Sequence, residues 1–424
     1  MSIRRFFETE RYQYCLVAAA LAVALAAIVI RNAWGDVDHY WVNISEVLID
    51  HRAPYSDTHF EYPPVALAIF AIPRLVAWDL NSFRYAYAVF AGLAYLVSMR
   101  YALRIGDHFG ISRIRIFIIY FLSALWLNQF IIARYDIFPA LTILMGIDAF
   151  LKGKHDRAAI LIAVGTMMKL YPALVILAFI YVFVSKREWF KAVRCLGLCI
   201  IGCALIMLPF MINDLSTAFS WLTIHSSRGI QVESVIGTIM EVGSYFAPGS
   251  VTMINNYGSD NITGDIPDAV APFMNYVMLA GILMVAAMML YTALRKGHTT
   301  QELERNVVIT SLALILAFIV FNKVYSAQYG LWAITLVPLL YYPTEPKLDD
   351  RKFIVIVHVF GWLTFVAAMS YKISIEIWGV YNIQSALPAV ELAKNIATVV
   401  LFIAVLKLFW KQFDYTGTPA EGTS

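Results

Sequence analysis

The stretch that decides the fold runs from Phe273 to Leu294, FMNYVMLAGILMVAAMMLYTAL, and it carries no charged side chain. A helix of about 20 apolar residues matches the thickness of the hydrocarbon core of a bilayer, so this run predicts a membrane-spanning helix. Similar apolar runs lie at Tyr14–Ile30, Ile116–Leu127, Cys195–Ile212, Val307–Phe321 and Phe353–Met369. The sequence therefore predicts a chain that crosses the membrane many times.

The overall composition points the same way. Of the 424 residues, 60% are hydrophobic and 14% are charged, whereas a soluble domain has about 45–50% apolar and about 25% charged residues. The net charge of +3 is spread along the chain and forms no basic patch for nucleic acid. Cys195, Cys199 and Cys203 recur on one helix face, and we interpret them as small apolar residues of a span rather than as metal ligands.

The distribution of Lys and Arg predicts the orientation of the chain. Positive residues favour the cytoplasmic side, which places the N-terminal residues 1–13 and the tail, residues 411–424, in the cytoplasm. We expect one all-α transmembrane domain over residues 14–410, a bundle of about 11–13 spans. Its long external loops, residues 31–64 and 213–272, are predicted to form the mouth of a functional site.

Two local patterns add detail to this topology. Tyr40, Trp41 and Ile44 recur at helical spacing in the first external loop and predict a short helix at the membrane surface. The segment Lys169–Pro172 interrupts the apolar stretch Ala158–Val184, and proline cannot continue a helical hydrogen-bond ladder. We therefore expect two short helices there, of the broken kind that is tolerated where it lines a cavity.

Two acidic residues follow the first span, in the sequence Asp36-Val37-Asp38-His39-Tyr40. A carboxylate at the water boundary can act as a general base on an incoming hydroxyl group. A pair of carboxylates can instead hold a divalent cation. A solvated turn is the simpler alternative, and the motif by itself does not decide between these roles.

The external loops contain further candidates for binding. Glu61 and Tyr62 precede two prolines at the start of a predicted span, where they face the first loop or merely mark a helix start. His225, Arg228 and Glu233 lie close together in the second loop. Arg228 can bind a phosphate with two parallel hydrogen bonds, and Glu233 can orient it or bind hydroxyl groups. The alternative is an ordinary charged surface loop.

Polar residues within apolar segments form the last group of candidates. Lys169 and Tyr171 interrupt one such segment, and Lys323 and Gln328 follow another. Burying an ammonium group without an anion costs free energy, so a phosphate bound beside Lys169 would explain its position. Alternatively, the Lys169 side chain extends to the membrane–water interface. The polar break Asn128–Asp136 either lines the same cavity or only forms a loop.

Four of these motifs occur in an order that resembles the GT-C superfamily of membrane glycosyltransferases. They are the Asp-x-Asp loop at residues 36–38, Tyr-Pro-Pro at 62–64, Lys-Leu-Tyr-Pro at 169–172 and Lys-Val-Tyr-Ser-x-Gln-Tyr-x-x-Trp at 323–332. The resemblance extends from about residue 34 to 338. It is strongest to glycosyltransferase family 87, the bacterial α-mannosyltransferases that use polyprenol-phosphate mannose, and extends to the eukaryotic enzyme that adds the first mannose to the GPI precursor.

This resemblance implies a GT-C type fold and an inverting transfer on the extracytoplasmic side. A hydroxyl of a glycolipid or glycan acceptor attacks a hexose, mannose in this group, that is linked to polyprenyl phosphate. The catalytic base of such enzymes is an Asp of the first external loop, four residues before a Tyr, which matches Asp36 and Tyr40; Asp38 is the second candidate. No cofactor is expected, although a divalent cation is an alternative. The break before Asp136 departs from the Gly-Gln or Arg-Gly-Asn of relatives.

Two other classes of protein remain as alternatives. A transporter or flippase for lipid-linked sugars also uses intramembrane charges, but it more often has inverted repeats and binding groups near the bilayer midplane. No internal repeat is evident here, and the candidate charges lie mostly toward the outer edge. A lipid-sugar polymerase or ligase would use a diphosphate donor instead.

Overall fold

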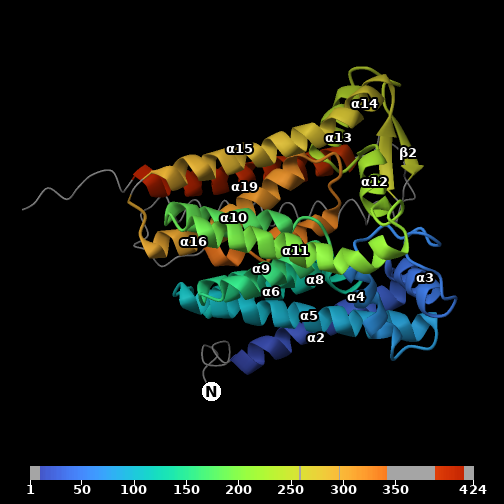
Figure 1. Ribbon diagram of the computed structural model, residues 1–424. Helices are drawn as coiled ribbons and strands as arrows, with labels where there is room; N and C mark the ends of the chain where they lie inside the picture. Colours follow the sequence, from blue (N-terminus) through green and yellow to red (C-terminus); the bar gives the residue numbers. More distant parts are fainter. Residues whose placement is uncertain (1–9, 257–258, 296, 341–386, 415–424) are drawn as a thin grey trace, which may run out of the picture. The chain divides into compact units, whose positions relative to one another are not determined.

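The computed structural model describes residues 10–256, 259–295, 297–340 and 387–414, which fold mainly into α-helices (Figure 1). In this part of the chain, six helices are long and apolar enough to cross a bilayer, and five shorter apolar helices accompany them. The prediction of an all-α, polytopic membrane protein is confirmed. The predicted span Phe353–Met369 lies outside the described residues, and the total of about 11–13 spans stays a prediction.

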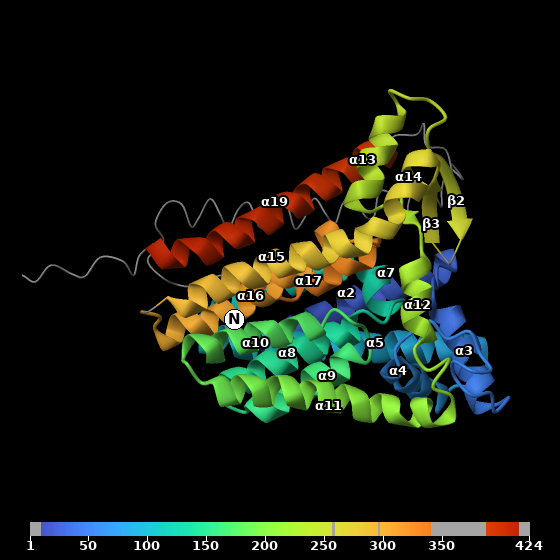
Figure 2. The same cartoon turned by 45° about the horizontal axis from the view of Figure 1, so that its top comes forward.

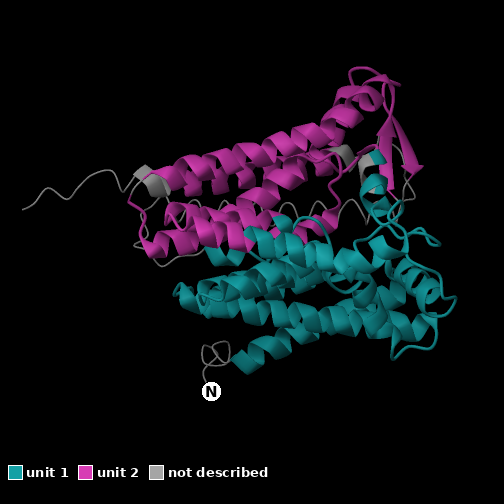
Figure 3. Cartoon of the chain, in the orientation of Figure 1, with its two compact units in different colours: residues 1–173, 196–227, 334–343 teal, residues 174–195, 228–333, 344–424 magenta. Residues whose placement is uncertain are grey.

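The chain divides into two compact units (Figure 3). Unit 1 comprises residues 1–173, 196–227 and 334–343, and unit 2 comprises residues 174–195, 228–333 and 344–424. Each unit is described by itself.

Unit 1 is built from helices of very different lengths. They are α2 (Glu10–Arg31), α3 (Val37–Leu48), α4 (Val65–Arg74), α5 (Leu80–His108), α6 (Arg113–Trp126), α7 (Asn128–Ile132), α8 (Ile137–Leu151), α9 (His155–Thr166), most of α11 (Trp189–Asn213), α12 (Ser220–Ser227) and the 3-10 turn η3 (Val337–Leu340). Helix α8 packs against α5 and α9. Gly165 permits the close approach of α8 and α9, because a Cβ atom there would lie 2.1 Å from Oγ1 of Thr142.

The short helices of unit 1 begin and end near the predicted motifs. The surface helix predicted in the first external loop is α3, which buries Tyr40 and Ile44. The predicted break at Lys169–Pro172 is also confirmed, because α9 ends at Thr166 and the next helix, α10 (Ala173–Ser185), begins after Pro172. Helix breaks therefore place polar side chains and free backbone groups within an otherwise apolar bundle.

In unit 2 the long helices α15 (Met274–Leu294), α16 (Thr300–Phe321) and α19 (Leu387–Asp414) run side by side (Figure 2). Helix α16 is the most enclosed of the candidate spans. The remaining elements of unit 2 are α10, α13 (Val235–Ser244), α14 (Asp265–Val270), η1 (Ala271–Phe273), η2 (Ala327–Tyr329), most of α17 (Gly330–Ile334) and three short strands.

The three strands form a small antiparallel sheet that the sequence did not predict. Strands β1 (Ile230–Gln231), β3 (Ser259–Thr263) and β2 (Thr252–Asn256) lie in the order β1-β3-β2, with Ile262 paired to Ile230 and Met253. Ile230, Val232 and Ile262 form a separate apolar core beneath the sheet. Strands of two to five residues carry too short an alternating pattern to be recognised within a polar loop.

Candidate active site

The carboxylates of the first external loop lie at a sharp turn between α2 and α3. Gly35 makes this turn with a positive φ of 58°, a conformation that glycine adopts without strain. The preceding carbonyl of Ala33 accepts a hydrogen bond of 3.0 Å from the side-chain amide of Gln129. Asp36 is the N-cap of α3, although its side chain makes no capping hydrogen bond to the helix. The turn thus points the Asp36 carboxylate away from the helix that it begins.

Asp38 is bound by an arginine through both of its carboxylate oxygens. Nε of Arg84 donates to Oδ1 at 2.7 Å, and Nη2 donates to Oδ2 at 2.6 Å. The same guanidinium lies over the ring of Trp34, 5.7 Å from the centroid. Such fork-to-fork pairs are strong and orient both partners. Asp38 therefore fastens α3 to α5.

Asp36 is held differently. Nη1 of Arg134 forms an ion pair with Oδ2 of Asp36, and the two side chains are 18% and 30% exposed. The two carboxylates differ in their partners: Arg84 donates hydrogen bonds to both oxygens of Asp38, whereas Asp36 forms an ion pair with Arg134. Asp36 is partly exposed, and a general base must be reachable by the hydroxyl that it deprotonates.

Lys169 has a carboxylate of the chain as its partner. Its Nζ lies 2.6 Å from Oδ1 of Asp136 and 4.9 Å from the ring centroid of Tyr135. The lysine side chain is 19% exposed, whereas the aspartate is 1% exposed. The sequence argument required an anion beside Lys169, and Asp136 supplies it. Burial of Lys169 therefore no longer argues for a bound phosphate, which corrects that interpretation.

The aromatic residues of the motifs pack around this ion pair. The ring of Tyr40 stacks on Phe70 at 4.1 Å between centroids and meets Tyr62 and Tyr135 edge to face. Burial raises the pKa of Tyr40 well above its usual range. Tyr40 and Tyr171 are both closed off from solvent in this arrangement. Their rings pack the site, and the prediction that they contact a substrate stays a prediction.

The backbone joins two further motifs at the same place. The N–H of Val65, directly after the Tyr-Pro-Pro motif, donates to the carbonyl of Met167 at 2.8 Å. Glu61 and Tyr62 are half-buried here. Unit 1 thus brings together the first external helix, the Tyr-Pro-Pro motif, the polar break ending at Asp136 and the Lys-Leu-Tyr-Pro motif.

The other predicted residues lie elsewhere. His225 belongs to α12 of unit 1, and its side chain lies outside the described part of the structure. Arg228, Glu233, Lys323 and Gln328 belong to unit 2. Arg228 is half-buried. Burial lowers the pKa of the Lys323 ammonium. The main-chain N–H of Gln231 donates to the carbonyl of Lys323 at 2.9 Å, which joins the second external loop to the Lys-Val-Tyr-Ser motif.

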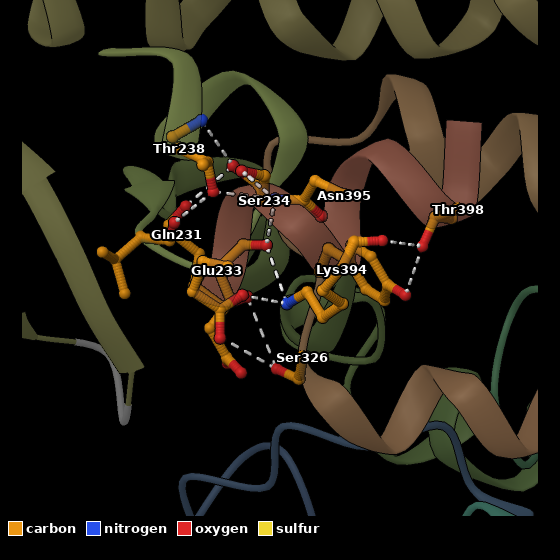
Figure 4. Close-up of polar contacts among 12 residues, drawn as sticks. Gln231, Glu233, Ser234, Thr238, Ser326, Lys394, Asn395 and Thr398 are labelled. Atoms are coloured by element: carbon orange, nitrogen blue, oxygen red, sulfur yellow. Dashed lines mark hydrogen bonds and ion pairs between the residues drawn. The ribbon is translucent and has the colours of Figure 1, made fainter. Parts of the chain in front are cut away.

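Glu233 lies in a buried polar network of unit 2 (Figure 4). Its carboxylate accepts from Nε2 of Gln231 at 3.0 Å, and the same amide lies 3.0 Å from Oγ of Ser326. The carbonyl of Glu233 accepts from Nζ of Lys394 at 3.1 Å and from the Asn395 amide at 3.2 Å. Helix α19 therefore holds the loop that carries Glu233.

Lys394 is also paired within its own helix. It forms an ion pair with Glu391, and both side chains are at most 1% exposed. Its Nζ lies 4.4 Å from the ring centroid of Tyr325 in the Lys-Val-Tyr-Ser motif. A buried charge is stable only when it is paired and hydrogen-bonded. Lys394 meets this condition through Glu391 and the carbonyl of Glu233, whereas the buried oxygens of Glu391 have the ion pair but no hydrogen bond within the described residues.

Sequence reasoning missed several of these residues, although each carried a signal. Arg134 and Asp136 lie in the polar break Asn128–Asp136, for which the sequence left two interpretations open, the lining of the cavity and a plain loop. Glu391 and Lys394 are ionisable residues within an apolar helix, a pattern that by itself suggests a role. Arg84 gave no signal, because an arginine near a helix start is common at a membrane surface.

Each carboxylate of the first external loop faces a guanidinium, Asp36 that of Arg134 and Asp38 that of Arg84. The alternative of a divalent cation held by these two residues stays a prediction. Within the described residues, no group of three or more His, Cys, Asp and Glu side chains is placed to hold a metal ion.

The fold and the polar residues at its helix breaks define a multi-pass membrane protein with an enclosed polar site. The model of Glycosyltransferase family 87 matches residues 60–322, more than half of the chain, and the chain belongs to this family of membrane glycosyltransferases. No curated protein matches the chain closely enough to count as a relative. The match is narrower than the resemblance seen in the sequence. It includes Lys169 and Glu233, but Asp36 precedes it and Lys323 follows it.

Proposed function

We propose that the chain transfers a hexose, with mannose as the first candidate, from a polyprenyl-phosphate donor to a hydroxyl of a glycolipid or glycan acceptor. The transfer takes place on the extracytoplasmic side and inverts the anomeric centre. Membership of the family supports a glycosyltransferase. The choice of donor and of mannose rests on the motifs that the chain shares with polyprenol-phosphate-mannose enzymes.

The observation that carries this proposal is the different state of the two carboxylates. Both oxygens of Asp38 accept hydrogen bonds from Arg84, whereas Asp36 forms an ion pair with Arg134 and is partly exposed. In the proposed step, the carboxylate of Asp36 accepts the proton of the acceptor hydroxyl. The hydroxyl oxygen attacks the anomeric carbon, and the bond to the phosphate oxygen breaks. The polyprenyl phosphate leaves with that electron pair.

The leaving phosphate needs positive charge. Because Asp136 pairs with Lys169, we assign the main role to Arg228 and Lys323. Arg228 can bind the phosphate through two parallel hydrogen bonds. We assign His225, Glu233 and Gln328 to the donor and Glu61 and Tyr62 to the acceptor side. A monophosphate donor carries little charge, so we expect no metal requirement.

The test is transfer by the purified protein in detergent. Radiolabelled polyprenyl-phosphate mannose and a lipid extract of the native membrane are supplied, and labelled glycolipid and released polyprenyl phosphate are measured. Polyprenyl-phosphate glucose and a polyprenyl-diphosphate sugar serve as competing donors. We expect a labelled product from the monophosphate mannose donor, also in EDTA. No product from any donor favours a transporter, and a product from the diphosphate donor alone favours a polymerase or ligase.

A further inference from the structure

We infer that Lys394 and Asn395 of α19 are positioning residues for donor binding: they hold the main chain at Glu233 and thereby set the place of its carboxylate. This inference rests on the proposed function, which assigns Glu233 to the donor. Helix α19 lies beyond residues 60–322, the part of the chain that the family model matches. The inference therefore gives a segment outside the matched residues a role in binding the substrate.

The main chain at Glu233 forms a tight turn between β1 and α13, and side chains of α19 hold this turn (Figure 4). The carbonyl of Glu233 accepts hydrogen bonds from Nζ of Lys394 at 3.1 Å and from Nδ2 of Asn395 at 3.2 Å. The Asn395 amide also lies 3.2 Å from the carbonyl of Ser234 and 2.7 Å from Oγ1 of Thr238. A carbonyl inside a protein needs such partners. Two adjacent side chains of one helix supply them here.

The side chain of Glu233 is bound to the same turn. Its Oε2 accepts a hydrogen bond from Nε2 of Gln231 at 3.0 Å, and that amide also lies 3.0 Å from Oγ of Ser326. The main-chain N–H of Gln231 donates to the carbonyl of Lys323 at 2.9 Å. A turn released from α19 would therefore move the carboxylate relative to Lys323, a cation that we assign to the donor phosphate.

The same part of α19 also contacts the Lys-Val-Tyr-Ser motif. Oγ1 of Thr398, one helical turn after Lys394, lies 3.1 Å from Oη of Tyr325. Nζ of Lys394 lies 4.4 Å from the centroid of the Tyr325 ring. All three side chains are buried. One helix thus contacts both of the segments that carry Glu233 and Lys323, which suits a role in setting their relative position.

A second buried amide of unit 2 provides a matched control. Asn306 of α16 is 1% exposed, and its Nδ2 donates to Oη of Tyr181 on α10 at 3.2 Å. A helix rises about 1.5 Å per residue, which places Asn306 about 20 Å along α16 from the helix end at Phe321. Asn306→Leu therefore makes the same change as Asn395→Leu at a buried position, but at a distance from the turn.

The experiment measures donor KM and kcat, with the acceptor saturating, and the midpoint of thermal unfolding. A hydrogen bond to a charged group is strong enough that we expect Glu233→Gln to raise donor KM by about tenfold. Asn395→Leu keeps the carboxylate but loosens its turn, and it should raise donor KM by about fivefold. Its kcat should stay within about twofold of the wild type, as expected when binding alone is weakened. Asn306→Leu should lower the unfolding midpoint and leave donor KM unchanged.

A double variant tests whether Asn395 acts through Glu233. If it does, Glu233→Gln combined with Asn395→Leu should have the donor KM of Glu233→Gln alone, because the effects of residues that act as a unit do not add. Effects that multiply would overturn the inference, since Asn395 would then contribute independently of Glu233. A wild-type donor KM in both Asn395→Leu and Asn306→Leu would also overturn it and leave Asn395 a structural role.

The outcomes separate this inference from the proposed function. If the wild type transfers no sugar from any donor, the proposed function fails and the inference fails with it. If the wild type is active and Glu233→Gln keeps a normal donor KM, the transfer stands but the roles of Glu233 and of α19 fail. If Glu233→Gln raises donor KM and Asn395→Leu does not, only the role of α19 fails.

A second variant covers the case in which Asn395→Leu does not fold. The combination Glu391→Gln, Lys394→Met removes both charges of the buried pair and also the bond from Nζ to the Glu233 carbonyl. It should raise donor KM by about fivefold as well, again with kcat nearly unchanged. A wild-type donor KM in this variant would overturn the inference.

Discussion

The ion pairs of unit 1 and the ion pair of unit 2 both place charged side chains inside an apolar protein, but they differ in how much of each pair is exposed to solvent. In unit 1, Asp36 with Arg134 and Lys169 with Asp136 keep one partner partly open to solvent. In unit 2, Lys394 and Glu391 are both closed off, and hydrogen bonds to the main chain complete the network. Open charges suit proton transfer, whereas closed ones fix the position of a loop. The comparison predicts that variants in unit 1 reduce turnover and that variants in the buried network reduce stability.

The largest expected effect is on catalysis. Asp36→Asn keeps the shape of the side chain but removes the base, and general-base catalysis contributes about 100- to 10,000-fold. We expect turnover to fall within this range while the unfolding midpoint stays close to that of the wild type. Asp38→Asn should retain measurable turnover, because Asp38 links α3 to α5 instead. Turnover assays of both variants check this, and a loss confined to Asp38→Asn would transfer the role of base to Asp38.

The second prediction concerns stability in unit 2. Lys394→Met leaves Glu391 buried without its cation, and breaking a buried pair typically costs about 3–5 kcal/mol. The combined variant Glu391→Gln, Lys394→Met removes both charges and should recover much of this loss. Lys152→Met is the control. Its partner Asp148 also forms an ion pair with Arg104, so the carboxylate keeps a cation when Lys152 is replaced, and the loss of stability should be smaller. Thermal unfolding in detergent measures all three, and equal losses in the two single variants would contradict the comparison.

A third prediction reverses what the sequence suggested for Lys169. An isolated lysine in an apolar segment should be replaced by methionine without loss of stability. The structure pairs it with the buried Asp136, so Lys169→Met takes the cation away from a buried carboxylate and should cost about 2 kcal/mol. Adding Asp136→Asn should restore stability. An unfolding midpoint of Lys169→Met at or above that of the wild type would show that the pair contributes nothing.

The last effect is a dependence of stability on pH, which is spread over several pH units. Burial, with the charge of Glu391, raises the pKa of Glu241 from its ordinary value of 4.5 to about 8. Between these values the folded state keeps a proton that the unfolded state has lost. Stability therefore falls as the pH rises, by at most about 1.4 kcal/mol per pH unit.

Glu241→Gln is neutral at every pH and should remove this part of the slope. The unfolding midpoints of Glu241→Gln, measured between pH 5 and 8, should then equal those of the wild type at pH 5 and exceed them at pH 8. Parallel curves for wild type and Glu241→Gln would show that Glu241 is not protonated in the folded protein.

The sequence by itself determined the membrane-spanning, all-α class, the helix at Tyr40 and the break at Lys169–Pro172. Hydropathy, helical periodicity and proline act over neighbouring residues, so these features can be recognised without a structure. The order of the motifs also indicated the family. The small sheet escaped prediction because its strands are too short to show a period.

Only the tertiary structure decided which side chains meet. The pairs of Asp36 with Arg134, Lys169 with Asp136, and Lys394 with the Glu233 carbonyl join residues that lie between 33 and 161 positions apart. Packing of whole helices sets such contacts, and no local pattern specifies them. The packing also distinguished Asp36 from Asp38, which lie two residues apart in sequence but have different arginine partners, Arg134 and Arg84.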